Sequence, residues 1–254
     1  MIRVGVFGAG GRMGTTVCAA VAGDGELELV AAIDPAHAGE SVEGVTIVAD
    51  PSELDAGSVD VVIDFTHVDA ARGNIRWAAE NAVHAVVGTS GLTNEDQDAF
   101  RAAFTKSNCV IAPNFAIGAV IMIALAERAA SYFDTVEVVE MHHDGKIDAP
   151  SGTAVFTAER IAAASTKWAT DPTTKMTLEG ARGASGAGDI HVHALRVRGM
   201  VASQEVIFGT TGQSLTIRHD TYDRNSFMPG VLLAAKAVGN KPGLTIGLDQ
   251  LLDL

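Results

Sequence analysis

The sequence has 254 residues, of which 47% are hydrophobic and 19% charged, and its formal net charge is -13. A chain of this length and composition can bury one large core or two moderate ones, which excludes a disordered protein. The acidic balance offers no general attraction to nucleic acid or to an anionic membrane surface, so we expect neither as a partner. Any anionic ligand must therefore be bound by a local group of cations.

The cysteines and the apolar segments indicate in which cell compartment the protein works. Cys18 and Cys109 lie far apart and have no metal-ligand spacing, so we expect neither a metal site nor a disulfide framework. The N-terminal segment enters an apolar run after one arginine, which is not the pattern of a signal peptide. The longest apolar run, Phe115 to Ala126, is too short to span a bilayer. These features predict a cytoplasmic protein.

Short runs rich in valine and isoleucine alternate with helical segments through the first 113 residues. Helices are expected at 69–82 and 93–107, and strands at 2–8, 27–34, 45–50, 59–65, 84–89 and 108–113. Near-continuous apolar strands are typical of parallel sheets that helices cover on both faces. The pattern therefore predicts an α/β fold with a Rossmann-type, doubly wound parallel sheet.

The pattern changes after this point. Helices are expected at 117–133 and 151–165, and strands at 134–143, 189–199, 202–210 and 213–220. The later strands alternate apolar and polar residues in the manner of antiparallel strands. A last apolar helix, 226–240, is expected to pack on the first domain. We therefore predict one domain of residues 1–113 and 225–254, and a second α+β domain of residues 114–224 with a mixed or antiparallel sheet.

A glycine-rich loop, GAGGRMG, follows the first strand. Its spacing is G-x-x-G-x-x-G at Gly8, Gly11 and Gly14, and such glycines allow backbone N–H groups and the next helix N-terminus to approach a pyrophosphate. The second strand ends at Asp34, whose carboxylate can accept hydrogen bonds from the adenosine ribose. Because no lysine or arginine directly follows Asp34, NADH is favoured over NADPH. A plain strand-to-helix turn is the alternative. The cofactor residues predicted in this part are Gly8, Ala9, Gly10, Gly11, Arg12, Met13 and Asp34.

Three later strands end in loops of similar character, DFTH, GTSG and APNF. Ligands of open α/β sheets bind beyond the carboxyl ends of the strands, so these loops are expected to line the nicotinamide half of the site. Capped turns without a ligand are the alternative for each loop. The residues predicted to contact the cofactor are Phe65, Thr66, Gly88, Thr89, Ser90, Ala112, Pro113, Asn114 and Phe115.

Two adjacent histidines and a lysine stand in the segment EMHHDGKIDAPSGTA, residues 140–154 of this acidic chain. Together with GAGGRMG, DFT, GTSG and APNFAIG, this segment resembles the 4-hydroxy-tetrahydrodipicolinate reductase (dihydrodipicolinate reductase) family over nearly the whole length. The resemblance implies an oxidoreductase of lysine and diaminopimelate biosynthesis. Such an enzyme reduces 4-hydroxy-tetrahydrodipicolinate to tetrahydrodipicolinate with NADH or NADPH.

The resemblance also implies roles for residues of the histidine segment. His142 would be the catalytic acid and Lys146 a second donor and anchor, and imidazole, with an ordinary pKa of about 6.5, is suited to donate a proton near neutral pH. Local cations would hold the dicarboxylate substrate against the net negative charge. A homotetramer built through the antiparallel strands of the second domain is also implied. The residues that would bind the substrate are His143, Ser151, Gly152 and Thr153.

Two other functions are compatible with parts of the pattern. Another two-domain NAD(P)-dependent reductase, such as a semialdehyde dehydrogenase, would need a nucleophilic cysteine, and neither cysteine falls on a predicted catalytic loop. A module that senses NAD(H) without turnover would have no need of His142 and Lys146. His191 and His193 share one face of a predicted strand but have no third ligand, so they are assigned a structural role.

Overall fold

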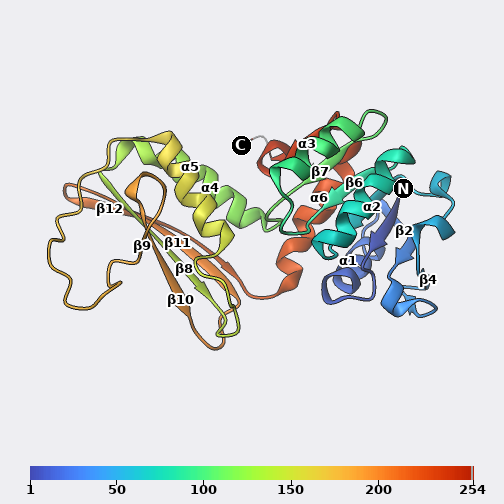
Figure 1. Ribbon diagram of the computed structural model, residues 1–254, viewed down its shortest axis with the longest axis horizontal. Helices are drawn as coiled ribbons and strands as arrows, with labels where there is room; N and C mark the ends of the chain where they lie inside the picture. The colour runs from blue at the N-terminus through green and yellow to red at the C-terminus, as the bar shows by residue number, and fades with distance from the viewer. Residues whose placement is uncertain (253) are drawn as a thin grey trace. The chain divides into compact units, whose positions relative to one another are not determined.

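The computed structural model describes residues 1–252 and 254, and the chain divides into two compact units (Figure 1). The first unit contains Met1–Ile117 and Arg224–Leu254, and the second contains Gly118–Asp223. The chain thus leaves the first unit once and returns to it for its last helix and strand.

The first unit is built on an eight-stranded sheet of order β13-β7-β6-β5-β1-β2-β4-β3. Only the edge strand β3 is paired antiparallel; the other strand pairs are parallel. The strands are β1 (Ile2–Phe7), β2 (Leu27–Ile33), β3 (Ser41–Val42), β4 (Val45–Val48), β5 (Val61–Asp64), β6 (His84–Val87), β7 (Cys109–Ile111) and β13 (Leu244–Ile246).

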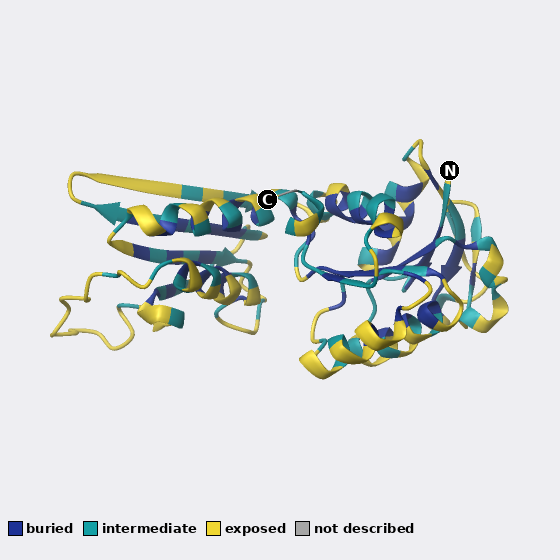
Figure 2. Cartoon of the chain, turned by 90° about the horizontal axis from the view of Figure 1, so that it is seen from above, coloured by how far each residue is buried: buried dark blue, intermediate teal, exposed yellow. Residues whose placement is uncertain are grey.

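Helices cover both faces of this sheet. They are α1 (Arg12–Ala22), α2 (Val68–Glu80), α3 (Asn94–Ala103) and α6 (Met228–Ala237). Helices α1 and α6 pack together on one face and α2 and α3 on the other, with the buried strands between the two layers (Figure 2). All four residues of β5 and all three of β7 are buried. The prediction of a doubly wound parallel sheet is therefore confirmed, since only strands covered twice can be apolar throughout.

The second unit is a five-stranded sheet of order β12-β11-β8-β10-β9. Its elements are α4 (Ile117–Ala129), β8 (Thr135–His142), α5 (Gly152–Ala164), β9 (Ala184–Ser185), β10 (His191–Arg196), β11 (Ala202–Thr210) and β12 (Gln213–Thr221). The predicted mixed sheet is confirmed. β11 runs antiparallel to β8, whereas β10 runs parallel to it because the chain crosses over through α5 between them.

One face of this second sheet forms the core of the unit. Helices α4 and α5 both pack on that face, where Ile123 and Ile161 contact a cluster with Val138, Val206 and Phe208. Because side chains alternate along a strand, each neighbouring residue of β8 and β11 points to the opposite face. Among the described residues of this unit, no α-helix covers that opposite face.

Residues 1–252 and 254 contain neither a membrane-spanning helix nor a group of metal-binding side chains. Within them no helix is long and apolar enough to cross a membrane. The same residues include no group of three or more histidine, cysteine, aspartate or glutamate side chains that could hold a metal ion.

Candidate active site

The loop between β1 and α1 is shaped by glycine. Gly8 has a positive φ of 73°, and the Gly11 N–H donates to its carbonyl at 3.0 Å. A Cβ on Gly14 would lie 1.9 Å from the Gly8 carbonyl oxygen, so the helix can run this close to the loop only with glycine there. Gly11 is the N-cap of α1 and has no side chain to bond the first-turn N–H groups. This arrangement fits the pyrophosphate of a dinucleotide.

Asp34 lies directly after β2 and beside the glycine loop. Its carboxylate accepts hydrogen bonds from the Gly10 N–H at 3.1 Å and from the Ala36 N–H at 3.0 Å. His37 Nδ1 lies 3.1 Å from Asp34 Oδ2. The structure therefore brings the predicted ribose-binding carboxylate to the loop that is predicted to bind the pyrophosphate.

A buried carboxylate, Asp64, organises the loops that follow β5 and β6. Its Oδ1 accepts hydrogen bonds of 2.8 Å from the Thr66 N–H, the Thr66 hydroxyl and the Thr89 hydroxyl. Its Oδ2 accepts a further bond of 2.8 Å from the Asn74 amide. Asp64 is only 2% exposed, and its four donors hold two predicted cofactor loops in one arrangement.

Aromatic packing joins the same two loops to the loop that follows β7. The Phe65 ring lies so close to Gly88 that a Cβ there would be 2.1 Å from it, and the Phe65 and Phe115 ring centroids are 5.6 Å apart. The Ala112 N–H donates to the Val87 carbonyl at 3.0 Å. The loops after β1, β5, β6 and β7 thus meet at the carboxyl ends of adjacent strands, where the chain order of the sheet reverses.

The remaining residues of the predicted cofactor set differ in exposure. Ala9 is buried, Met13 is half-buried, and Arg12, Ser90 and Pro113 are exposed. The Asn114 side chain accepts a hydrogen bond from the Ala116 N–H at 2.8 Å. Every predicted cofactor residue lies in the first unit.

In the second unit, His142 is the last residue of β8 and is held by a buried glutamate. His142 Nδ1 lies 2.5 Å from Glu140 Oε2, and the Glu140 side chain is fully buried. Both side chains point to the helix-covered face, because they are two residues apart on one strand. Burial by itself would raise the pKa of Glu140, but hydrogen bonds from Arg196 and His142 outweigh it, so the pKa lies below its ordinary value.

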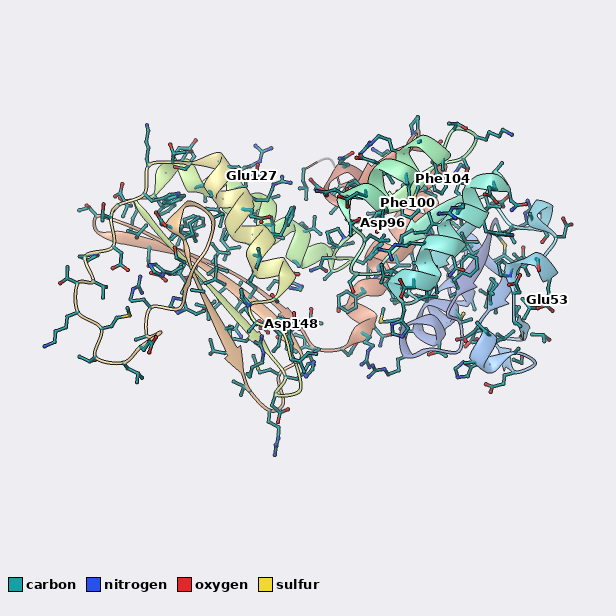
Figure 3. The ribbon with its side chains drawn as sticks, viewed as in Figure 1. Glu53, Asp96, Phe100, Phe104, Glu127 and Asp148 are labelled. Carbon is teal, nitrogen blue, oxygen red and sulfur yellow. The ribbon has the colours of Figure 1, made fainter. Side chains whose placement is uncertain are left out.

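The loop after His142 carries the other predicted cations. His143 is exposed, and its carbonyl accepts a hydrogen bond of 3.2 Å from the Lys146 N–H. Lys146 Nζ donates to both carboxylate oxygens of Asp148, at 2.7 and 2.8 Å. Asp148 is labelled in Figure 3, and its backbone carbonyl accepts a 2.6 Å bond from Arg196. The Lys146 side chain is 20% exposed, so its ammonium can change partners when an anion arrives.

Helix α5 starts at the end of this loop. The Ser151 hydroxyl caps the helix by accepting a hydrogen bond from the Ala154 N–H at 3.2 Å, and the Ser151 N–H donates to Glu140 Oε1 at 3.1 Å. Gly152 and Thr153 form the first helical turn, where N–H groups lack acceptors within the helix. The helix N-terminus and Lys146 therefore offer positive charge near the His142 end of the sheet.

The two cysteines are unsuited to nucleophilic chemistry. Both are fully buried, and burial raises the pKa of the Cys18 thiol to about 12 and the pKa of the Cys109 thiol above its ordinary value. Burial thus disfavours the thiolate form of both side chains near neutral pH. The semialdehyde dehydrogenase alternative therefore lacks its nucleophile among the described residues.

His191 and His193 lie on the opposite face of the second sheet. His191 Nε2 is 3.1 Å from Asp171, and His193 Nε2 is 2.6 Å from Glu137. A hollow nearby is lined by His191, Asp171, Trp168 and other residues, and it includes none of the predicted site residues. Both histidines thus lie beside carboxylates.

Sequence reasoning did not find Glu140 or Arg196, and it placed Asp64 in the DFTH loop without assigning it a role. Glu140 could have been found by its spacing, since it precedes His142 by two residues on one strand and therefore shares its face. The roles of Arg196 and Asp64 gave no comparable signal, because their partners are distant in the sequence: Arg196 donates to Glu140 across 56 residues, and Thr89 donates to Asp64 across 25.

Comparison with known proteins agrees with this geometry. Residues 2–115 match the family described as dihydrodipicolinate reductase, N-terminus, and residues 118–252 match the one described as dihydrodipicolinate reductase, C-terminus. Proteins named 4-hydroxy-tetrahydrodipicolinate reductase from Nocardia farcinica and Cutibacterium acnes are 48% and 47% identical, and each alignment covers 100% of this chain and at least 99% of the relative.

A similar solved structure is the dipicolinate-bound dihydrodipicolinate reductase from Paenisporosarcina sp. TG-14. It is 38% identical, with a TM-score of 0.89, and the match covers 98% of this chain and 99% of that one. The aspartate semialdehyde dehydrogenase II of Vibrio cholerae, at 15% identity and a TM-score of 0.55, shares the fold alone.

Proposed function

The chain belongs to the dihydrodipicolinate reductase family, and we propose that its NAD(P)H-dependent reduction of 4-hydroxy-tetrahydrodipicolinate uses His142 as the proton donor. The reaction is a step of lysine and diaminopimelate biosynthesis. The observation that carries the assignment is the His142–Glu140 pair at the end of β8, next to the N-terminus of α5. An imidazolium paired with a buried carboxylate is a proton donor held at a defined place.

In this proposal the two units have different roles. The first unit binds the dinucleotide through the glycine loop, Asp34 and the loops after β5, β6 and β7. The second binds the substrate and supplies the proton. Elimination of the 4-hydroxyl group with a neighbouring ring hydrogen, as water, gives a conjugated imine. When bound, NADH or NADPH supplies the hydride that reduces this imine, and negative charge then develops on the substrate ring. His142 neutralises that charge by giving up a proton, which completes the reduction.

The substrate carboxylates are held by local positive charge. A net charge of -13 disfavours a dianion at long range, so binding depends on nearby cations and helix N–H groups. His143 and Lys146 are proposed to contact the substrate together with the first turn of α5, formed by Gly152 and Thr153 behind Ser151. Lys146 would exchange Asp148 for a substrate carboxylate, because the Asp148 side chain is 60% exposed and an ion pair at the surface contributes little.

We expect NADH to be used at least as well as NADPH. Asp34 is proposed to bind the adenosine ribose, and its carboxylate would repel a 2′-phosphate on that ribose. The direct test follows oxidation of each cofactor while the upstream synthase generates the substrate in place. Replacing Asp34 with alanine should raise KM for NADH more than KM for NADPH. A hundredfold preference of the unaltered enzyme for NADPH would refute the role of Asp34, and absence of turnover with both cofactors would refute the reductase assignment.

The sheet face opposite α4 and α5 supports a homotetramer. Val139, Met141 and Ile207 are only half-buried there, and Leu195 is 38% exposed, so an apolar stripe runs across three strands. Pairing this face between copies would remove the stripe from water. Sedimentation equilibrium should therefore give the mass of four chains, and Ile207→Asp should shift the population to smaller species. A monomer at micromolar concentration would contradict the proposal. The enzyme is proposed to work in the cytoplasm.

A further inference from the structure

A fully buried glutamate stands in the centre of the second sheet. Glu140 lies on β8, between β10 and β11, and points to the face that α4 and α5 cover. Its direct partners across the sheet are Ala194 and Gln204, which carry no charge. A carboxylate in such surroundings is stable only when hydrogen bonds and an opposite charge compensate the loss of water.

Four donors compensate this carboxylate. Arg196 donates to Oε2 at 2.9 Å and to Oε1 at 3.0 Å, His142 Nδ1 lies 2.5 Å from Oε2, and the Ser151 N–H donates to Oε1 at 3.1 Å. A carboxylate has about four acceptor positions, so this arrangement uses all of them. Each of its four contacts must be a donor, and His142 must therefore carry a proton on Nδ1.

That requirement determines which nitrogen of His142 reacts. A neutral imidazole has one N–H, and a proton on Nδ1 leaves Nε2 as the acceptor. Protonated His142 carries its second proton on Nε2, and loss of that proton returns the ring to the tautomer that Glu140 bonds. Proton transfer at Nε2 thus leaves every hydrogen bond of Glu140 unchanged.

The same network connects the proton donor to the substrate-binding loop. Glu140 bonds the backbone at Ser151, where α5 begins, and Arg196 bonds the Asp148 carbonyl at 2.6 Å. The loop that carries His143 and Lys146 is therefore anchored at its far end to the carboxylate that holds His142. The groups that face His142 here are the ionised Glu140 and the always-charged Arg196, and the residue paired with it on β11, Ala202, carries no charge.

We propose that Glu140 is a positioning residue that holds His142 as the Nδ1–H tautomer with Nε2 directed to the reaction, and that Arg196 keeps Glu140 in place. The proposal rests on the proposed role of His142 as proton donor. Glu140 itself does not touch the substrate. Its function is to select one of two tautomers and to stabilise the imidazolium before it reacts.

The decisive measurement needs no substitution of Glu140. Protein labelled with ¹⁵N in its histidine rings should show neutral His142 protonated on Nδ1, and the His142→Gln variant identifies the signals. A neutral Nε2–H tautomer would overturn the proposal. Because this measurement uses the intact enzyme, it is independent of whether any Glu140 variant folds.

Glu140→Gln should lower kcat by on the order of 10²-fold, because the amide can donate to Nδ1 and stabilise the wrong tautomer. NADH binding, measured by fluorescence, should stay unchanged. Glu127→Gln is the matched control: Glu127 of α4, labelled in Figure 3, pairs with Arg160 of α5 at 2.6 Å and is remote from His142 in sequence and hydrogen bonding. It should retain full turnover.

A double variant distinguishes failure of the positioning role of Glu140 from failure of His142 as the proton donor. If Glu140 acts through His142, adding Glu140→Gln to His142→Gln should cost no further turnover. Full turnover of His142→Gln would refute the proton donor itself. A large loss of turnover in His142→Gln combined with a normal kcat in Glu140→Gln would refute only the positioning role.

Discussion

Replacing His142 with glutamine should lower kcat by roughly 10² to 10⁴, the usual range for a general acid, and change KM modestly. Glutamine keeps the approximate size and can still donate to Glu140, so the loop and the helix cap should persist. In the proposed function, the substitution removes a proton that moves as charge develops in the transition state, and that interaction contributes to kcat rather than to substrate binding. Stopped assays with the genuine substrate measure both constants, and NADH fluorescence serves as the control for intact cofactor binding.

We expect Lys146→Ala to change kcat and KM in a different way from His142→Gln. In the proposed function the Lys146 ammonium contacts the dianionic substrate in both the ground state and the transition state, so we expect KM to rise and kcat to fall together. Full turnover by His142→Gln would exclude His142 as the acid, and Lys146 or a bound water would then have to donate the proton. A pure effect of Lys146→Ala on kcat would instead assign the donor role to the lysine.

Gly14→Ala should weaken NADH binding by more than tenfold and lower the free energy of unfolding by about 1 to 3 kcal/mol, the usual effect of overpacking. The new Cβ would lie 1.9 Å from the Gly8 carbonyl oxygen and 2.8 Å from the Ala9 Cα. Both atoms belong to the backbone, so no side chain can rotate away, and the loop or the helix must shift. That shift would move the first-turn N–H groups away from the pyrophosphate.

Gly73→Ala is the matched control for this substitution. Gly73 lies on the exposed side of α2, and a Cβ there would meet nothing within 4 Å. Because alanine is the better helix former by about 1 kcal/mol, stability should rise slightly and NADH affinity should not change. Fluorescence titration of both variants measures their NADH affinity, and chemical denaturation measures their free energy of unfolding. Normal NADH affinity in Gly14→Ala would contradict the assignment of this loop to the cofactor.

Much of the architecture could be predicted because it depends on local pattern. Strands buried on both faces must be apolar along their whole length, and this alone indicated the parallel sheet of the first unit. Positions such as Gly8 and Gly14 are recognisable in the sequence because backbone geometry there excludes a side chain. The position of Asp34 followed from the length of the second strand. Each of these inferences needs only neighbours along the chain and the rules of one repeating element.

Local sequence pattern indicated the parallel sheet of the first unit, the glycine loop and the histidine-lysine segment. The partners that hold these groups in place depend on the tertiary structure. Arg196 reaches Glu140 because β10 pairs in parallel with β8 after the crossover through α5. Asp64 reaches Thr89 because β5 and β6 are adjacent in the sheet. A buried carboxylate needs donors on every side, and strands distant in sequence supply them. Local pattern does not specify such partners, because strand order and register are set by the packing of the whole sheet.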